Sequence, residues 1–468
     1  MSVPVTASED GVQVVTRNSI EHAQPTFVYQ RSKLGPFTLP PYRSGSFQLG
    51  ILAIIFLLGP GLFAALIGLG GAGLGNPIPV NNSYIINYGT SAAVGFFAGP
   101  VMQRIGLRLS LSLGAAAFTF YSATLLIYKR TQEGWVLLLG GAILGVFSSF
   151  SWTAQGTMLL SYPLANRKGK HISLNLAGFN AGASLGSIVV FAQNVHSTQA
   201  DVNEATYITF IAVMALGIAL SLIILEMRDV IRSDGSPASA HVPVVTVTKT
   251  LHNFFRRLKT DPHIIALFPM MFASNFYLPY IFNDVNLARF NVRTRALNVV
   301  LFYAVGILGA YFAGILLDIK RLSLATRVKW GLVQLLILFV AIFAGAYAWQ
   351  HPIPRKATET LGFHLIDCTD WDFVPPLFLF LSFGFTHFVF QGTIYWFMAT
   401  LADKSATAST SDFSGYFKSL QSVGAAVSWA VSNAQLEFNT DLAISGGLVI
   451  GSVAAAAPIL IRRTAKRS

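Results

Sequence analysis

Charge and cysteine are both scarce in this sequence. Only 11% of its 468 residues are charged, whereas soluble globular domains have roughly 25%. Cys368 is the single cysteine, which excludes an intramolecular disulfide and a metal cluster built on cysteine. No stretch has the spacing of a hydrolase triad, a metal site or a phosphate-binding loop. We therefore expect neither an enzyme nor a bound cofactor.

Apolar residues are abundant instead. Hydrophobic residues make up 53% of the chain, and its mean hydropathy is +0.57. A helix that crosses a bilayer needs about 20 mostly apolar residues, and windows of this length predict an all-α integral membrane protein with twelve transmembrane helices. The expected spans are residues 47–71, 82–103, 107–128, 135–160, 172–194, 205–226, 264–287, 297–317, 328–349, 373–399, 413–436 and 440–461.

The position of the basic residues explains the net charge of +12. If both termini and the loops after even-numbered spans lie on one side, that side carries 25 of the 32 Lys and Arg residues. Such an asymmetry marks the cytoplasmic side of a membrane protein. We therefore expect both termini in the cytoplasm, the lipid bilayer as a partner and no nucleic-acid partner. The membrane is either the plasma membrane or an internal one.

The spans divide into two six-helix bundles separated by a polar linker. The N-terminal tail is polar and contains several prolines, so we expect it to have little structure of its own. The linker ends in a basic amphipathic stretch, residues 249–259, which either lies on an anionic membrane surface or packs on the protein. The predicted segments are a tail at 1–46, a bundle at 47–226, a linker at 227–262, a bundle at 263–461 and a basic tail at 462–468.

A pattern of small residues indicates that the two bundles are related. Ser91, Gly95 and Gly99 are four residues apart, and the same spacing of small residues ends at Gly314, 215 residues after Gly99. Small residues at this spacing share one helix face and allow another backbone to come close. A chance match in a chain rich in Gly and Ala is the alternative. In both bundles a polar residue and a basic cluster follow, which marks a helix leaving the membrane.

Pro60 lies between two glycines near the centre of the first span. Proline removes a backbone donor and clashes with the preceding turn, so it should bend or break this helix. A broken helix exposes backbone polar groups, which is tolerated where protein or water covers them. The break either serves a cavity or is a kink that serves packing.

Amide side chains are concentrated in five of the twelve spans, the fourth, fifth, seventh, tenth and eleventh. Because amides are costly in a bilayer, these spans are expected to line an interior. Each amide either contacts a ligand or joins two helices. His387 lies near the middle of a span and is either a proton carrier, a substrate contact or a neutral core histidine. The amides are Gln155, Asn175, Asn180, Asn275, Gln391, Gln421 and Asn433.

Two further features lie near the expected outer ends of spans. Asp284 is followed by Arg289, Arg293 and Arg295, and we interpret this group as a surface cluster rather than an outer gate. Asn81 begins the glycosylation sequon Asn81-Asn82-Ser83, although it lies close to the membrane.

Several stretches resemble a known family. The sequences G-x-x-x-Q-R-x-G-x-R, from Gly99 to Arg108, and G-x-L-L-D, from Gly314 to Asp318, are similar to the loop signatures of the major facilitator superfamily. The first departs from the signature, because Gln103 stands where the family has Asp. A closer resemblance is to the Unc-ninety-three-like family, in its fungal branch. It is carried by residues 42–48, 60–73, 88–99, 152–173 and 415–429.

The resemblance implies a central cavity between two bundles, although the asparagines usual in that family at Ala64 and Ile67 are missing here. We therefore expect a transporter that moves a small neutral or amphipathic organic molecule by alternating access. The alternative is a non-transporting regulatory subunit or trafficking partner of a client membrane protein. The residues expected to line the substrate site are Trp152, Gln155, Asn175, Asn180, Asn275, His387, Gln391 and Gln421. Those expected to control rocking of the bundles are Gly99, Gln103, Arg104, Gly106, Arg108, Gly314 and Asp318.

Overall fold

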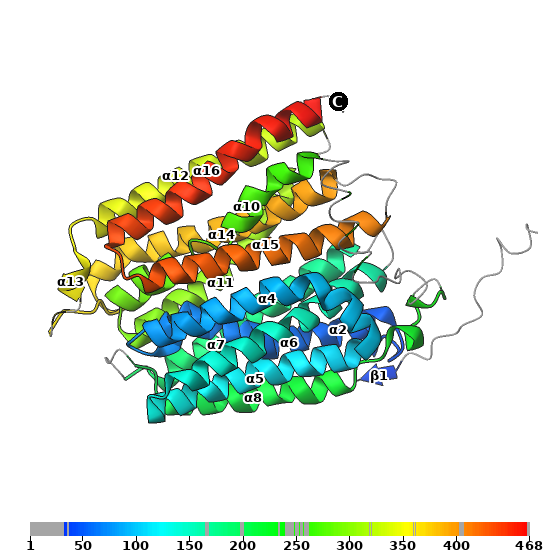
Figure 1. The fold of residues 1–468 in the computed structure, drawn as a ribbon, viewed down its shortest axis with the longest axis horizontal. Coiled ribbons are helices and arrows are strands. Elements are labelled where there is room, and N and C mark those ends of the chain that lie inside the picture. Colours follow the sequence, from blue (N-terminus) through cyan, green and yellow to red (C-terminus); the bar gives the residue numbers. More distant parts are fainter. Residues whose placement is uncertain are drawn as a thin grey trace, which may run out of the picture.

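A computed structural model gives the fold of the chain (Figure 1). Most of the amphipathic stretch 249–259 lies outside the residues that it describes. The described residues are 32–34, 37–163, 168–196, 201–232, 235–238, 248, 252, 256, 262–317, 319, 321–358, 360, 362–401 and 407–465.

The first bundle contains six long helical segments. The first segment is interrupted and consists of an α-helix, a π-helical turn and a second α-helix. The elements are α2 (Gly45–Phe56), η1 (Leu57–Gly61), α3 (Leu62–Gly68), η2 (Gly71–Gly73), α4 (Ile78–Ile105), α5 (Leu107–Thr131), α6 (Gly134–Ser161), α7 (Lys168–Gln193), α8 (Glu204–Leu222) and η4 (Met227–Asp229).

The second bundle repeats this plan. Its first segment is again interrupted, in this case by a turn and a π-helix. The elements are η6 (Pro262–Leu267), α10 (Phe268–Ala273), η7 (Tyr280–Leu287), α11 (Val292–Leu317), α12 (Leu324–Gln350), α13 (Arg355–Thr358), η8 (Trp371–Phe373), α14 (Val374–Leu401), α15 (Thr407–Asn433) and α16 (Phe438–Ala465).

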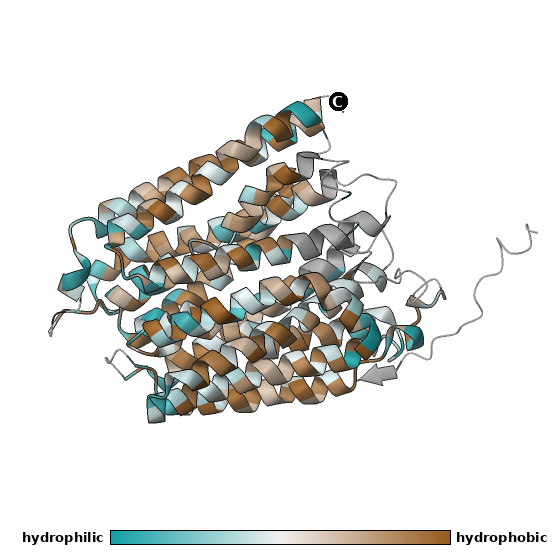
Figure 2. Cartoon of the chain, viewed as in Figure 1, coloured by the Kyte–Doolittle hydropathy of each residue, from teal (hydrophilic) through white to brown (hydrophobic). Residues whose placement is uncertain are grey.

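The described residues therefore contain twelve long helical segments, the number that the hydropathy windows predict. Nine of them, within the described residues, meet the length and apolarity expected of a span. The other three are α4 and α15, which carry more polar residues, and the broken segment from η6 to η7. Large apolar side chains such as Leu308 and Ile337 are exposed, by 61% and 63%. Hydrophobic residues predominate along the helices (Figure 2). In a bilayer these side chains face lipid.

The N-terminal tail contains more structure than the sequence indicates. Strands β1 (Ser32–Leu34) and β2 (Phe37–Leu39) form an antiparallel hairpin, with Lys33 opposite Thr38. This hairpin lies at the same end of the bundle as the C-terminus (Figure 1). We call this the terminal end, and the opposite end, where α13 lies, the distal end. The fold thus places both ends of the helical region together, as an even number of spans requires.

The two bundles meet along a seam in which α4 packs on α15 and α7 packs on α11. Aromatic rings cross this seam: the Tyr84 and Trp429 centroids are 4.6 Å apart, and those of Phe179 and Tyr303 are 6.3 Å apart. The seam therefore contains side chains from both halves of the sequence.

Pro60 interrupts the first segment, as the sequence predicts, and the interruption is the π-helical turn η1. The surroundings of this turn support a role in packing. A Cβ atom on Gly61 would lie 2.8 Å from the carbonyl oxygen of Phe179, and one on Gly182 would lie 2.2 Å from that of Leu57. Only hydrogen fits at these two positions, so η1 allows the backbones of the first segment and α7 to touch.

Candidate functional site

The structure brings three of the predicted amides together in the second bundle. Gln391 Nε2 donates to Asn275 Oδ1 at 2.9 Å, and Gln421 Nε2 donates to the Ser274 hydroxyl at 2.9 Å. The Gln421 amide also lies 3.3 Å from Gln391 Oε1 and from Asn275 Oδ1. The hydrogen-bonded cluster thus contains residues from three segments: the interrupted seventh segment, α14 and α15. We call Ser274, Asn275, Gln391 and Gln421 the amide cluster.

The first bundle contributes a smaller polar group. Gln155 on α6 donates through Nε2 to Asn175 Oδ1 on α7, and both side chains are buried. Asn180, one turn further along α7, is also buried, and its Oδ1 has no hydrogen-bond partner among the described residues. Asn175 Nδ2 is likewise without one. Such unpaired polar atoms inside a membrane protein are costly unless water or a ligand reaches them.

Lys418 links the amide cluster to the Trp152 ring of the first bundle, and the sequence analysis misses it. Its ammonium donates to Gln421 Oε1 at 3.0 Å and lies 4.9 Å from the centroid of the Trp152 ring. Lys418 belongs to α15 and Trp152 to α6, so this cation–π contact crosses the seam. Lys418 is only five residues from the start of its expected span. A lysine in that position is counted among the basic residues of the preceding loop, so it is not considered as a site residue. Its helical spacing from Gln421 is the signal that would reveal its position.

His387 lies in an aromatic pocket rather than in the amide cluster. Its Nδ1 is 2.9 Å from the Tyr277 hydroxyl, and the rings of Tyr277, Phe302 and Phe388 surround it at 5.0–5.8 Å between centroids. The side chain is 8% exposed. This environment is that of a core histidine with one hydrogen bond, which is one of the alternatives that the sequence leaves open.

At the distal end, side-chain amides close the seam. Asn283 Nδ2 donates to Asn81 Oδ1 at 3.1 Å, and Asn283 Oδ1 accepts from the backbone N–H of Gly71 at 3.1 Å. Asn433 Nδ2 donates to Asn82 Oδ1 at 2.9 Å. Each of these bonds joins the first bundle to the second. We call them the distal seal.

The distal seal corrects the glycosylation prediction. Asn81 is completely buried, so its amide is inaccessible to a modifying enzyme in this conformation. The sequon lies inside α4 rather than in a loop, because the helix begins earlier than the hydropathy windows indicate. Asn81 instead contacts the opposite bundle.

The predicted gating residues lie around the terminal end, except that Asp318 is outside the described residues. A Cβ atom on Gly99 or Gly314 would meet nothing within 4 Å, so neither glycine marks a close helix contact in this conformation. Gln103 is partly exposed and Arg104 is exposed at the end of α4. The close contacts of this pattern in α4 lie earlier in the helix. Ser91 Oγ donates to the Gly145 carbonyl at 3.1 Å, and a Cβ on Gly95 would lie 3.1 Å from the Ser419 hydroxyl.

Gly106 and Arg108 fix the turn between α4 and α5. Gly106 has φ = +92°, a conformation that favours glycine,. The Glu226 carboxylate accepts from the backbone N–H groups of Leu107 and Arg108 at 3.0 and 3.1 Å. Arg108 Nε donates to the carbonyl of Ile224 at 2.8 Å. All of these contacts lie within the first bundle. The sequence analysis does not single out Glu226, whose carboxylate binds both backbone N–H groups at the start of α5,.

The interpretation of Asp284 and the following arginines as a surface cluster is wrong. Asp284 and Arg295 are completely buried, and Arg289 is 5% exposed. Asp284 pairs with Arg355 at 2.8 Å, and the Arg289 guanidinium stacks 4.3 Å from the Trp349 centroid. The partners come from distant parts of the sequence, so local spacing does not reveal them.

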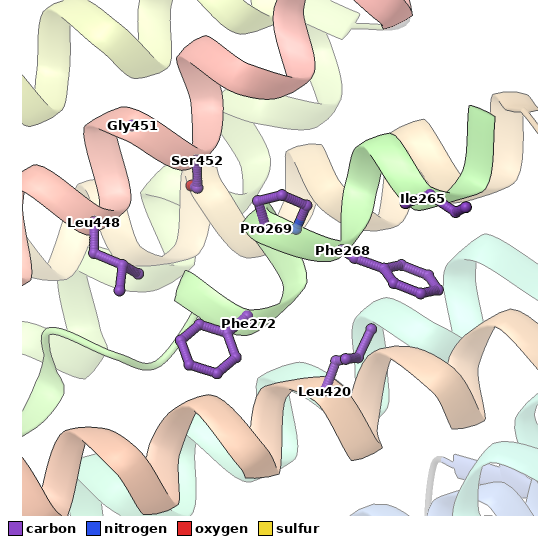
Figure 3. A pocket seen from close by; sticks show the side chains of 8 residues that line it. All are labelled: Ile265, Phe268, Pro269, Phe272, Leu420, Leu448, Gly451 and Ser452. Atoms are coloured by element: carbon purple, nitrogen blue, oxygen red, sulfur yellow. The ribbon is translucent and has the colours of Figure 1, made fainter. Parts of the chain in front are cut away.

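An apolar pocket of about 510 Å³ lies within the second bundle (Figure 3). Figure 3 shows Phe268, Pro269 and Phe272 on one side and Leu448 on α16 on another. Ile265 and Leu420 also line the pocket, so its lining is suited to an apolar group such as a hydrocarbon chain. It contains none of the predicted site residues.

The fold and this seam define a membrane transporter class. Residues 34–428 match the model of the Major Facilitator Superfamily, so the chain belongs to that superfamily. Within it, the chain belongs to the UNC93-like proteins. It is 34% identical to an UNC93-like protein of Schizosaccharomyces pombe over 94% of this chain and 87% of the relative. It is 32% identical to UNC93-like protein 1 of Arabidopsis thaliana over 86% of each chain.

A solved structure shows the same fold at low identity. The crystal structure of the nucleoside transporter NupG matches with a TM-score of 0.61 at 13% identity. The match covers 88% of this chain and 98% of that one. The expected family and the expected fold, a twelve-helix membrane protein of the major facilitator type, are therefore confirmed.

Proposed function

We propose that this chain transports a small amphipathic organic molecule by alternating access, and that the molecule binds in the seam between the amide cluster and the Gln155–Asn175 pair. The observation that carries the proposal is the contact of Lys418 on α15 with the Trp152 ring on α6, 4.9 Å from the ammonium to the centroid. A molecule held between these two side chains touches both bundles at once. Rocking of the bundles would then change its access from one side to the other.

The chemistry around Lys418 supports an amphipathic substrate. A lysine ammonium has three donors, and one of them is used by Gln421. Among the described residues Lys418 forms no ion pair. On the other side, Trp152 packs edge-on against Phe56 at 4.9 Å between centroids. A polar group with acceptor atoms would meet Lys418 and the amides, while an apolar part would lie against these rings.

The distal seal supports movement of the bundles. A neutral hydrogen bond contributes only about 0.5–1.5 kcal/mol net, because water replaces it on opening. The bonds of Asn81 and Asn82 to the opposite bundle are of this kind. We propose that the terminal end faces the cytoplasm, which the basic loops favour, and that the structure represents a state closed at the distal end.

Reconstitution tests this proposal. Candidate ligands would first be selected by thermal shift of the purified protein, since a ligand that binds the folded state raises its stability. Uptake of the selected compounds is then measured in proteoliposomes with the wild type, Lys418→Ala and the exposed control Lys356→Ala. A charge-assisted hydrogen bond contributes about 1.5–3 kcal/mol, so Lys418→Ala should weaken binding at least about tenfold.

Two outcomes would reject the proposal. One is equal uptake by Lys418→Ala and the wild type, which removes the lysine from the site. The other is no uptake of any selected compound, together with co-purification of a membrane protein from native membranes. The second outcome would favour the rival function, a regulatory subunit or trafficking partner.

A further inference from the structure

Two buried carboxyl groups face each other at the distal end of the second bundle. Asp284 on η7 is completely buried and Asp441 on α16 is 3% exposed. The segments η7 and α16 pack on each other, and the two carboxyl groups interact. The Oδ2 atoms of both residues have no hydrogen-bond donor among the described residues. An ionised carboxylate has no donor of its own, so two such oxygens can bond to each other only through a proton.

One guanidinium pairs with Asp284, and it does not hydrogen-bond to Asp441. Arg355 Nη2 donates to Asp284 Oδ1 at 2.8 Å, and its guanidinium carbon lies 4.4 Å from the centroid of the Phe438 ring. The remaining donors are directed elsewhere: Nε to the carbonyl of Leu436 and Nη1 to Gln435 Oε1. Two buried negative charges with one buried positive charge leave one charge uncompensated, which is costly in a membrane protein.

Among the described residues, the other groups around the pair supply no second buried cation, since Lys356, beside Arg355 on α13, is exposed. Tyr280 donates to Gln350 Oε1 at 2.6 Å, and Gln350 donates to the backbone carbonyl of Asp284 at 2.7 Å. Ser445 donates to Asp441 Oδ1 at 3.2 Å. The ionisable groups on the neighbouring segments are Glu437, which is exposed and accepts from the Arg355 backbone, and His351, which is exposed beside Asn439.

From this geometry we propose that Asp284 and Asp441 form a proton-binding site that holds one proton between their Oδ2 atoms. The proton makes the group of two acids and one arginine neutral, and it gives each orphaned oxygen a partner. The site is separate from the proposed substrate site. It is adjacent to the distal seal, because Asp284 follows Asn283, the residue that bonds to Asn81.

Infrared spectroscopy of the detergent-purified protein tests the site directly. Asp441→Asn replaces the shared proton with an amide N–H that can reach Asp284 Oδ2, so the fold should be kept. At neutral pH the wild type and the exposed control Asp372→Asn should show the C=O band of a protonated carboxyl group, and Asp441→Asn should lose the intensity of one such group. Equal bands in all three proteins would overturn the proposal.

Thermal unfolding gives a second readout. An exposed Asp in the unfolded chain ionises near a pKa of about 3.9, while the folded pair keeps its proton. The folded state therefore binds more protons, and wild-type stability should fall relative to Asp441→Asn as pH rises from 5 to 8. A constant difference over this range would contradict the proposal.

Two further measurements test the proposal, one on a second variant and one on the effect of added salt. Should Asp441→Asn not fold, Ser445→Ala removes only the hydroxyl that donates to Asp441 and should shift the carboxyl band; an unshifted band would count against the site. A rise in melting temperature with sodium chloride, but not with choline chloride at equal ionic strength, would show that a cation rather than a proton joins the carboxylates and would overturn the proposal.

Discussion

Asn283 and Asn81 form a buried hydrogen bond, 3.1 Å from Nδ2 to Oδ1, between residues 202 positions apart in the chain. Asn283 donates in addition to the Ser432 hydroxyl at 3.0 Å and accepts from the N–H of Gly71. One side chain thus joins α4, the turn after α3 and α15. At this same turn a Cβ on Gly70 would lie 2.1 Å from the carbonyl of Phe282. The two bundles are in close contact here.

Asn283→Ala should therefore favour opening of the distal end. The substitution removes all three bonds of the side chain, and it leaves the Gly71 N–H and Asn81 without these partners, each at a cost of about 1–3 kcal/mol while they stay buried. Opening admits water and removes this cost. Ser432→Cys in a Cys368→Ser background provides a buried reporter for a membrane-impermeant maleimide, and we expect faster labelling when Asn283→Ala is added.

The matched control is Asn439→Ala, which changes an amide at the same end but outside the seam. Labelling in this variant should match that of the reporter protein alone. If Asn283→Ala labels no faster than this control, Asn283 does not hold the distal end closed.

The sequence predicts the number and type of helices and the inward orientation of the amide-bearing spans because both follow from the cost of polar groups in lipid. Asn275, Gln391 and Gln421 are rare amides in apolar spans, and turning them inward is the only inexpensive arrangement. The distal seal is different. Asn81 and Asn283 lie near helix ends, where polar residues are common, and nothing local distinguishes a seam contact from exposure to water.

Local sequence patterns also fail to show which charged residues are buried. Asp284 is followed by three arginines within eleven residues, which is typical of an exposed loop. Its ion-pair partner is Arg355, 71 residues away. Lys418 is missed for a related reason, since it lies near the start of the expected span 413–436, where a lysine is typical of a loop charge, whereas α15 begins earlier, at Thr407. Both errors arise because tertiary contacts, rather than spacing, decide whether a charge is paired.

Gly424 should be intolerant of even a methyl group. A Cβ at this position of α15 would lie 1.9 Å from the carbonyl oxygen of Phe272 on α10. Gly424→Ala must push these helices apart one turn from Gln421, and overpacking of this kind costs about 1–3 kcal/mol. We expect a lower thermal midpoint than in the wild type.

The control for this prediction is Gly447→Ala on α16, where a Cβ would meet nothing within 4 Å. Alanine is a better helix former than glycine by up to about 1 kcal/mol, so this variant should be unchanged or slightly more stable. Equal destabilisation by both substitutions would mean that the close approach at Gly424 is not what the methyl group disturbs.

Asp367, in the distal loop before α14, should make that loop sensitive to acid. Burial opposes ionisation of this carboxyl, but donors from Arg293, Thr369 and Asn291 outweigh it and hold its pKa well below the usual range. The Arg293 Nε to Asp367 Oδ2 distance is 2.7 Å. Because the folded pKa is depressed, the stabilisation is present above the unfolded pKa of about 3.9 and is lost as pH falls below it.

Hydrogen exchange of residues 362–370 measures this effect. In the wild type, protection of the loop should be constant between about pH 5 and 7, after correction for the intrinsic rate, and should fall below about pH 4. In Asp367→Asn the protection should be lower at neutral pH and should show little further loss in acid. An acid-induced loss of the same size in both proteins would assign the effect to another group.

Glu226 should be necessary for the turn between α4 and α5. Its two carboxylate oxygens accept from Leu107 N and Arg108 N, the first two N–H groups of α5. A carboxylate at this position also interacts favourably with the positive end of the helix dipole. Glu226→Ala leaves both donors without this acceptor, and the loss of a cap of this type costs about 0.5–2 kcal/mol.

The thermal midpoint and the hydrogen exchange of residues 106–110 should both report this loss, with Glu226→Gln giving an intermediate result because it keeps an oxygen acceptor without the charge. Asp229→Ala is the matched control, since Asp229 is three residues away and its carboxylate is 3.9 Å from Arg228 in an exposed pair of little energetic weight,. If Glu226→Ala behaves like Asp229→Ala, the turn is held by Gly106 and by the bond from Arg108 Nε to Ile224 rather than by the carboxylate. A difference between the two variants would instead show that the predicted gating segment depends on an acid at the end of the sixth span.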